Sequence, residues 1–328
     1  MRRTIAAISA ALIWTALSVL PASAADKVVL MLNWYVYGEH APFYYGKAKG
    51  IYAAEGIDLE IQEGRGSAAT TQAVAAKTAN FGYVDVPTMM RAAVKGAPIT
   101  ATGVLLQTSP MSAMGFVEKN IKKPEDIKGK TVAITPADSM TQIWPLFLKK
   151  TGLKESDFQT VAGDGQTKLN AVINGQADLL LGYVMDQAIK LQDATQKQVY
   201  PIRFADYGVN LVSSGIIVNK ETLAKNPDMV KRFMRAATKS LEEAAKNPEA
   251  AIDAMLKANP KSGVRDTALV GMKATAALYK GPDNSGDRPF RVGGKNMQES
   301  FLLLTEYGGL EKASAGKVED YYTNAYLP

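Results

Sequence analysis

The sequence predicts an α/β fold of two lobes, and three observations support this prediction. Short apolar runs alternate with helical patterns from residue 28 onward, which is typical of largely parallel sheets covered by helices. The alternation passes through two successive cycles, and the second begins near Ser112. At 328 residues, the chain is also near the length at which a single hydrophobic core stops growing and a chain divides.

The first cycle is expected to contain four strands and three helices. Its apolar runs predict strands at 28–32, 57–61, 81–84 and 99–106. Helices are predicted to begin at Ala41 and to cover 67–77 and 87–95. Pro42 fits the first turn of its helix, where a backbone amide needs no partner.

The second cycle repeats this pattern and is followed by a mostly helical tail. Strands are expected at 130–135, 177–183 and 212–218, and a helix at 165–174. A further helix is predicted by apolar residues at i, i+3, i+4, i+7 and i+8, namely Met140, Ile143, Trp144, Phe147 and Leu148. One long amphipathic helix is marked in the tail by Val230, Phe233, Met234, Ala237 and Leu241.

The two cycles suggest how the chain divides into lobes. Boundaries near 107–110 and 210–214 make residues 109–212 one lobe, and residues 25–108 together with 213–328 the other. The chain then passes between the lobes twice, and two such crossings are the geometry of a hinge.

Residues 1–24 are predicted to be a cleaved signal peptide. Arg2 and Arg3 precede an apolar stretch from 5 to 20, and Ala22-Ser23-Ala24 provides a small-x-small cleavage site. The alternative is a membrane anchor, but the stretch is shorter than the roughly 20 residues that span a bilayer. We therefore expect a soluble, periplasmic chain from residue 25 onward.

Charge and cysteine content exclude several classes of function. Removal of Arg2 and Arg3 lowers the net charge from +6 to +4, and the basic residues are scattered, which argues against nucleic-acid binding. The sequence has no cysteine, which excludes a thiolate nucleophile, a zinc–thiolate site and a lipid-modified cysteine.

Four segments carry a resemblance to a known family. They are Asn33-Trp34 with Gly50-Ile51-Tyr52-Ala53-Ala54-Glu55-Gly56-Ile57-Asp58-Leu59, and residues 80–85, 122–132 and 169–181. In these segments the chain resembles the periplasmic binding proteins for thiamine-pyrimidine precursors, sulfonates, taurine and nitrate, and is most similar to the pyrimidine-precursor branch. The resemblance implies a type II periplasmic binding protein fold, in which two α/β lobes close on a small molecule in a cleft. It also implies a monomer that delivers its ligand to an ABC permease in the inner membrane.

The ligand site is expected in the loops that follow the strands, because ligands of open parallel sheets lie beyond the carboxyl ends of the strands. The predicted ligand-binding residues are Trp34, Tyr37, Glu39, His40, Asp85, Gln107, Ser139, Gln166, Tyr183, Asp186 and Asn210. Trp34 is expected to stack on the ligand, since the resemblance places an aromatic platform there. His40 is the only histidine and is expected to donate a hydrogen bond or to have no function. Ser139 could instead cap a helix, as could Asp138 and Asp164.

The charge of these loops favours one class of ligand. Acidic side chains predominate (Glu39, Asp85, Asp138, Asp164, Asp186 and Asp206), with Arg65 and Lys168 as the possible cations. Such a site suits a neutral or amine-bearing heteroaromatic ring better than an anion. Capture of a thiamine pyrimidine precursor is therefore the leading functional hypothesis, and a sulfonate, taurine or nitrate binder is the alternative.

A second alternative is an enzyme, because the resemblance extends to eukaryotic pyrimidine-precursor synthases. Those enzymes carry a cysteine-rich motif that this sequence lacks. No nucleophile–base pair or metal-spaced cluster is evident, and residues 64–67 lack the spacing of a phosphate-binding loop. The sequence thus predicts a binding protein without catalytic residues, metal or cofactor.

Overall fold

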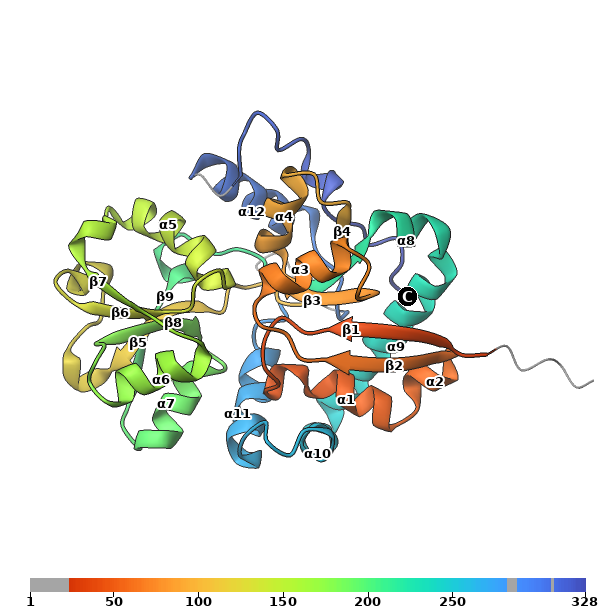
Figure 1. Cartoon of the computed structure of the whole chain (residues 1–328), viewed down its shortest axis with the longest axis horizontal. Coiled ribbons are helices and arrows are strands. Elements are labelled where there is room, and N and C mark those ends of the chain that lie inside the picture. The colour runs from red at the N-terminus through yellow and green to blue at the C-terminus, as the bar shows by residue number, and fades with distance from the viewer. Residues whose placement is uncertain (1–23, 282–287, 308–309) are drawn as a thin grey trace, which may run out of the picture.

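The computed structural model describes residues 24–281, 288–307 and 310–328, which form two sheets with helices packed against both faces of each (Figure 1). Residues 1–23 of the expected signal peptide lie outside the described residues, so the cleavage site stays a prediction. Within the described residues, no helix combines the length and apolar character that crossing a membrane requires.

The first sheet has five strands in the order β2-β1-β3-β10-β4. Their bounds are β1 Asp26–Met31, β2 Ile57–Gln62, β3 Phe81–Asp85, β4 Ile99–Val104 and β10 Ser214–Asn219. The early helices of this part are α1 Ala41–Ala48, α2 Ile51–Ala54, α3 Ser67–Ala75 and α4 Val86–Val94. The tail adds α8 Lys220–Lys225, α9 Pro227–Lys246, α10 Pro248–Ala258, α11 Arg265–Ala276 and α12 Gly294–Glu306.

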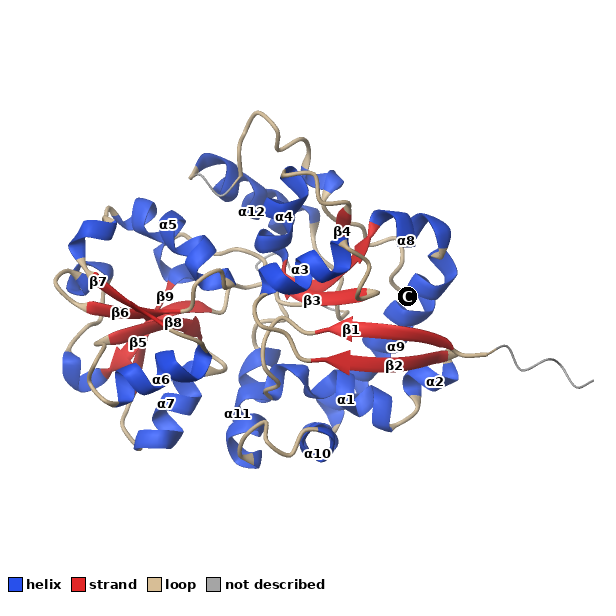
Figure 2. Ribbon diagram, viewed as in Figure 1, coloured by secondary structure: helices blue, strands red, loops and turns tan. Residues whose placement is uncertain are grey.

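The second sheet has the same pattern, with the strand order β7-β6-β8-β5-β9. Its strands are β5 Met111–Phe116, β6 Thr131–Ile134, β7 Gln159–Ala162, β8 Leu179–Tyr183 and β9 Val199–Arg203. The helices packed on it are α5 Ser139–Thr151, α6 Gly165–Ile173 and α7 Gln187–Thr195. Figure 2 shows the two sets of strands as separate layers between helices.

Each sheet contains one strand that is antiparallel to its neighbours. These strands are β10 in the first sheet and β5 in the second. Both follow a crossing of the chain from one sheet to the other. The crossings lie at the edge where the parallel strands end, so the entering strand must run away from that edge. The predicted α/β fold with largely parallel sheets is confirmed.

The two crossings lie side by side and are hydrogen-bonded to each other. The Ser213 amide donates to the Leu106 carbonyl at 2.8 Å, and the Ser109 amide donates to Asn210 Oδ1 at 3.0 Å. Paired extended segments of this kind can bend together without losing their hydrogen bonds. The assignment of residues 25–108 with 213–328 and of 109–212 to two lobes is compatible with these sheets and stays a prediction.

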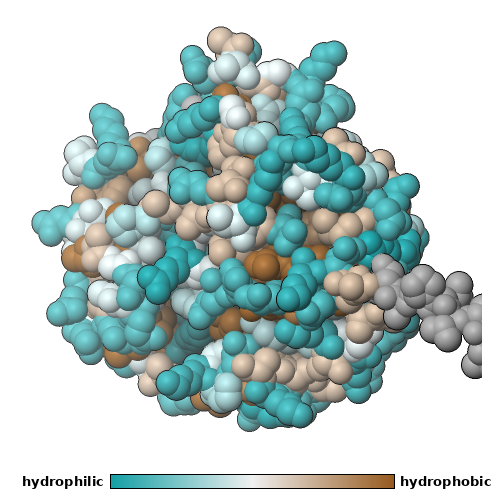
Figure 3. Space-filling view, turned by 45° about the vertical axis from the view of Figure 1, so that its right-hand side comes forward, coloured by the Kyte–Doolittle hydropathy of each residue, from teal (hydrophilic) through white to brown (hydrophobic). Residues whose placement is uncertain are grey.

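The amphipathic patterns in the sequence correspond to faces that pack on the sheets. Phe233 of α9 stacks on Phe81 of β3 with ring centroids 3.8 Å apart, and both rings are fully buried. On the second sheet, Phe147 of α5 stacks on Phe204 at 4.2 Å, and Trp144 packs beside them. The polar residues that alternate with these positions cover the outer surface, and Figure 3 shows a largely hydrophilic face with small apolar patches.

Three strands, β5, β7 and β9, were not expected from the sequence. β5 is fully buried, but its residues Met111–Phe116 include serine and glycine and so do not form a continuous run of large apolar side chains. β7 and β9 occupy opposite edges of the second sheet. Most of their side chains are exposed or half-buried. With so little buried surface, β7 and β9 lack the continuous apolar run that marks most of the buried strands.

Candidate functional site

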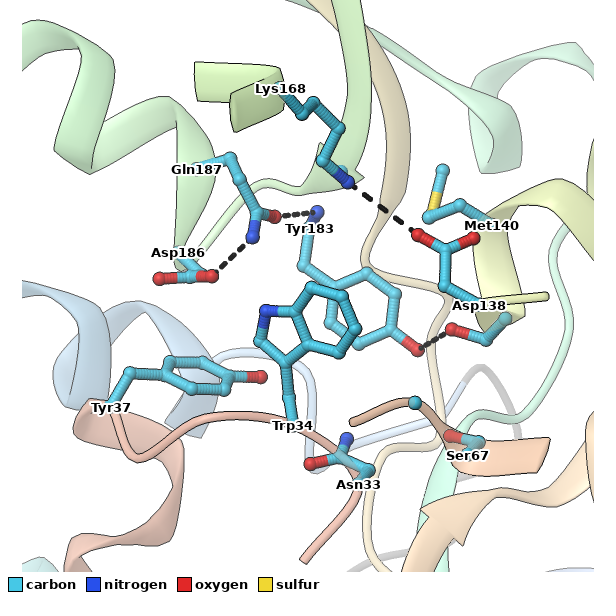
Figure 4. A pocket seen from close by; sticks show the side chains of 13 residues that line it. Asn33, Trp34, Tyr37, Ser67, Asp138, Met140, Lys168, Tyr183, Asp186 and Gln187 are labelled. Carbon is cyan, nitrogen blue, oxygen red and sulfur yellow. Dashed lines mark hydrogen bonds and ion pairs between the residues drawn. The ribbon is translucent and has the colours of Figure 1, made fainter. Parts of the chain in front are cut away.

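A cavity of about 30 Å³ lies where the carboxyl ends of the strands of the two sheets face each other (Figure 4). We call it the inner cavity. From the first sheet it is lined by Asn33, Trp34, Tyr37, Gly66 and Ser67. From the second it is lined by Asp138, Ser139, Met140, Lys168, Gly182, Tyr183, Asp186 and Gln187. The lining comes from loops after strands and from helix amino-termini, which is where the strand-end rule places a ligand.

Trp34 occupies the centre of this site and packs against both parts of the molecule. Its indole stands among the other lining side chains in Figure 4. On the second-sheet side of the cleft, a Cβ on Gly165 would lie only 2.9 Å from the indole Cζ2, so the backbone at the start of α6 is in close contact with the ring. Lys168 Nζ lies 5.8 Å from the ring centroid. The remaining space is about enough for a water molecule, so a ring-sized ligand requires the indole or the sheets to move.

Asp186 is hydrogen-bonded across the cleft. The Tyr35 hydroxyl, from the loop after β1, donates to Asp186 Oδ2 at 2.6 Å. Lys190 Nζ lies 2.9 Å from Asp186 Oδ1 and 3.9 Å from the centroid of the Tyr35 ring. Burial, followed by the charge of Asp186, raises the pKa of Tyr35 well above its usual value, so this phenol remains a donor at every working pH. These contacts hold the two sides of the cleft together.

Lys168 is a buried cation in the wall of the inner cavity. Its Nζ donates to the Leu181 carbonyl at 2.7 Å and lies 3.5 Å from Asp138 Oδ2. Burial lowers the pKa of Lys168, while the Asp138 carboxylate opposes that shift. An ammonium has three donor hydrogens, so Lys168 can still turn one toward a ligand acceptor. The sequence prediction did not include Lys168 among the site residues, although it lies one turn after the Asp164 cap of α6.

Asn33 and His40 form a pair in which only Asn33 lines the inner cavity. Asn33 Oδ1 lies 2.8 Å from His40 Nε2, and the Tyr37 amide donates to His40 Nδ1 at 3.4 Å. These partners require the neutral imidazole with its hydrogen on Nε2. Burial, with a smaller effect from the charge of Lys190, lowers the pKa of His40 to about 3. His40, which was predicted to donate to the ligand, therefore donates its Nε2 hydrogen to Asn33 instead. The side-chain amide nitrogen of Asn33 faces the cavity.

Glu39 was predicted to contact the ligand, but it lies buried behind Tyr37. The Tyr37 and Tyr83 hydroxyls both donate to its carboxylate, the latter at 2.7 Å. Burial raises the pKa of Glu39, and the two phenols oppose that shift. The carboxylate orients the Tyr37 ring in the cavity wall and does not itself reach the cavity.

Tyr183 and Ser139 line the inner cavity, and the predicted site residue Asp85 lies behind them. The Tyr183 hydroxyl is 3.0 Å from Ser139 Oγ and 3.5 Å from Ser213 Oγ, which donates to Asp85 Oδ2 at 3.1 Å. Asp85 caps α4 by accepting from the Thr88 amide at 3.0 Å. Burial raises the pKa of Asp85 to about 6, against the opposing hydrogen bonds. Asp85 supports the cavity wall from the first sheet.

Three further predicted residues lie away from the inner cavity. Gln107 Nε2 donates to the Val104 carbonyl beside the first crossing, and Asn210 accepts from Ser109 between the crossings. Gln166 is exposed on α6 and bonds to Asn170. The strand-end rule selects the edge of each sheet at which the inner cavity lies. It does not predict which face of a loop or helix turn lines that cavity.

The expected excess of acidic charge in the site is not what the structure shows. Asp164 and Asp206 are exposed, and Asp164 caps α6 as Asp138 caps α5. Only Asp138 and Asp186 line the inner cavity, and each lies beside a lysine ammonium. Across the described residues, no group of three or more histidine, aspartate or glutamate side chains is placed to hold a metal ion.

Solved structures share this architecture. The alkanesulfonate-binding protein SsuA from Xanthomonas axonopodis pv. citri, bound to MOPS, superposes with a TM-score of 0.69 at 12% identity, over 92% of this chain and 99% of that chain. The periplasmic nitrate-binding protein NrtA from Synechocystis PCC 6803 has a TM-score of 0.67 at 13% identity, over 92% and 87% of the two chains. The fold is therefore that of the periplasmic binding proteins, as the sequence resemblance implied.

Sequence relatives point to one family within that fold. The riboflavin-binding protein RibY of Chloroflexus aurantiacus is 27% identical over 248 residues, 74% of this chain and 70% of that protein. A 4-amino-5-hydroxymethyl-2-methylpyrimidine phosphate synthase of Legionella pneumophila is 26% identical over 238 residues, 72% of this chain and 75% of the enzyme. The family model described as NMT1/THI5 like matches residues 38–251, which span α1, both crossings and the whole second sheet. The chain belongs to the NMT1/THI5-like family.

Proposed function

We propose that this protein is the periplasmic solute-binding component of an ABC importer, and that it captures a small heteroaromatic solute as a monomer. A thiamine pyrimidine precursor is the leading candidate. The observation that carries the proposal is the inner cavity, which combines an indole from the first sheet with polar groups from both sheets. The family and the predicted signal peptide support delivery to a permease in the inner membrane.

The lining groups fit an aminopyrimidine in three respects. The Trp34 indole offers a flat face for stacking, and aromatic pairs contribute about 0.5–1.5 kcal/mol beyond their buried area. Asp186 can accept a hydrogen bond from an exocyclic amine in place of the Tyr35 hydroxyl. The Asn33 amide, held by His40, can donate to a ring nitrogen.

Ligand entry requires the two sides to separate, because the inner cavity holds only about 30 Å³. The Tyr35–Asp186 hydrogen bond and the one from Thr267 of α11 to Asp193 of α7 must break during opening. A ligand that contacts both sides stabilises the closed state by its differential affinity for that state. The paired crossings provide the hinge for this motion.

Isothermal calorimetry with a panel of pyrimidines, sulfonates, taurine and nitrate tests the proposal. We expect a pyrimidine to bind and Trp34→Ala to weaken its binding at least tenfold. Tyr200→Ala is the matched control, since this ring on β9 is 39% exposed and lies outside the inner cavity. If Trp34→Ala binds the pyrimidine with unchanged affinity, the indole does not contact the ligand. Mass spectrometry of co-purified small molecules gives an independent identification.

An anion binder of the sulfonate, taurine or nitrate type is the alternative within the same class. Lys168 favours it, because this buried cation lines the inner cavity, as do the hydroxyl-bearing residues Ser67 and Ser139. The same calorimetric panel separates the two classes of ligand. In an anion binder, Lys168→Met abolishes binding, whereas Asp186→Asn leaves it intact or strengthens it.

A synthase is the remaining alternative, and the names of several relatives favour it. The chain contains no cysteine, whereas the eukaryotic synthases that its sequence resembles carry a cysteine-rich motif. Incubation of the purified protein with a bound pyrimidine, followed by mass spectrometry, tests for chemical change. Recovery of the intact ligand supports the binding role, and conversion with turnover overturns it.

A further inference from the structure

A second cavity of about 190 Å³ adjoins the inner cavity, and we call it the outer cavity. It lies between α7 and α11, which approach each other where the two halves of the molecule meet (Figure 1). Tyr37 and Asp186 line both cavities and therefore form the partition between them. In Figure 4 these two side chains stand on the same side of the indole.

The walls of the outer cavity are mainly apolar. Met185 and Ile189 line it from the second-sheet side, and Val264 and Ala268 line it from the start of α11 and the residue before it. Lys190 also lines it, but its ammonium is held by Asp186 at 2.9 Å and by the face of the Tyr35 ring. Asp193 at the rim accepts from Thr267 at 2.8 Å. The three charged side chains of the lining, Asp186, Lys190 and Asp193, are thus engaged by protein partners, which leaves apolar surface for an occupant.

The outer cavity exists only while the cleft is closed. Thr267 and Asp193 join α11 to α7 across it. Beside it, α11 packs closely against the segment before α7, since a Cβ on Gly271 would lie 2.8 Å from the Met185 carbonyl oxygen. An occupant of the outer cavity therefore touches both sides and favours closure, as does a ring in the inner cavity.

We propose that the solute has two parts, a planar ring bound at Trp34 and an uncharged apolar substituent that passes between Tyr37 and Asp186 into the outer cavity. This inference rests on the proposed function and specifies its class of ligand. The outer cavity is much larger than the inner one, so the closed protein has more room for a substituent than for a larger ring. An anionic substituent would have to compete with Asp186 for Lys190, which favours an uncharged one.

The test compares a 4-amino-2-methylpyrimidine ring with derivatives that carry methyl to butyl chains at one ring carbon. In the wild-type protein, affinity rises about fourfold for each methylene that enters the outer cavity. Val264→Trp fills the outer cavity from its rim, where Val264 is 61% exposed. This variant loses the gain for the longer chains and binds the bare ring as the wild type does. Val270→Trp is the control, because Val270 lies on α11, which begins directly after Val264, at 53% exposure and outside the lining.

The possible outcomes separate this inference from the function on which it rests. Equal affinity for the bare ring and the butyl derivative overturns the two-part ligand and leaves the proposed function standing. Equal weakening of both ligands by Val264→Trp also overturns it, and Ile189→Phe repeats the test from α7. Absence of binding to every member of the series overturns the proposed function and the inference together.

Discussion

The sole histidine makes the pH dependence of stability a sharp test of the site geometry. His40 is fully buried and neutral, with Nε2 bonded to Asn33 and Nδ1 accepting from the Tyr37 amide. Its pKa of about 3 lies well below the ordinary value of 6.5. Protonation would place a charge in this buried position and turn Nδ1 into a second donor opposite the Tyr37 amide.

The sign and size of the effect follow from linkage. Below pH 6.5 the unfolded chain binds a proton at His40 and the folded chain does not, so stability falls as the pH falls. Each unit of pH in this range costs about 1.4 kcal/mol. Between pH 7.5 and pH 5, the contribution amounts to about 2 kcal/mol. The sequence contains one histidine, so no other imidazole adds to it.

The measurement is urea unfolding of the wild type and of His40→Gln between pH 5 and pH 8. Glutamine is neutral throughout, and its amide can replace the Nε2 donor to Asn33. We expect the wild type to lose about 2 kcal/mol relative to the variant on going from pH 7.5 to pH 5. Parallel profiles for the two proteins would refute the buried, neutral imidazole and the orientation of Asn33 that follows from it.

Three further substitutions test other parts of the structure. The pKa of Asp85 is raised to about 6, because the buried site favours the protonated carboxyl. The stability that this protonated form gives the folded protein is fully present below about pH 4 and is lost as the pH rises through 6. Between pH 4 and pH 7 the wild type should lose about 2 kcal/mol relative to Asp85→Asn in urea unfolding, and no relative loss would contradict the burial. Gly165→Val places a Cβ 2.9 Å from Trp34 Cζ2, so we expect a more open cleft by small-angle scattering and at least tenfold weaker ligand binding. Gly294→Ala is the control and should change neither property, because a Cβ there has its nearest contact at 3.7 Å. Phe147→Ala should lower the free energy of unfolding by about 3–5 kcal/mol, and a loss below about 1 kcal/mol would contradict the stacked core.

Local patterns were sufficient to predict the order of most elements. The alternation of apolar runs and helical stripes predicted the five strands of the first sheet, β6 and β8 of the second sheet, and the long helix α9, because these elements bury apolar side chains at regular intervals. The caps Asp138 and Asp164 were also predictable, since a side chain accepts from an amide three residues ahead. β7 and β9 were missed because most of their side chains are exposed or half-buried, and β5 was missed because serine and glycine interrupt its buried run.

For the site, the sequence determined which loops meet but not which side chains face one another. Trp34, Tyr37, Ser139, Tyr183 and Asp186 were predicted and line the inner cavity. The strand-end rule depends only on chain direction, which the sequence encodes through the alternation of strands and helices.

Tertiary structure alone decided the direction of each side chain. Asn33 and Lys168 enter the cavity wall although neither was among the predicted ligand-binding residues, while Glu39 and His40 lie behind it and hold Tyr37 and Asn33. These choices depend on contacts between segments that are distant in sequence and on the cost of burying a charge without a partner. The local periodicity of the sequence thus determines most of the fold. The chemistry of the binding site depends on the tertiary contacts that form where the two sheets meet.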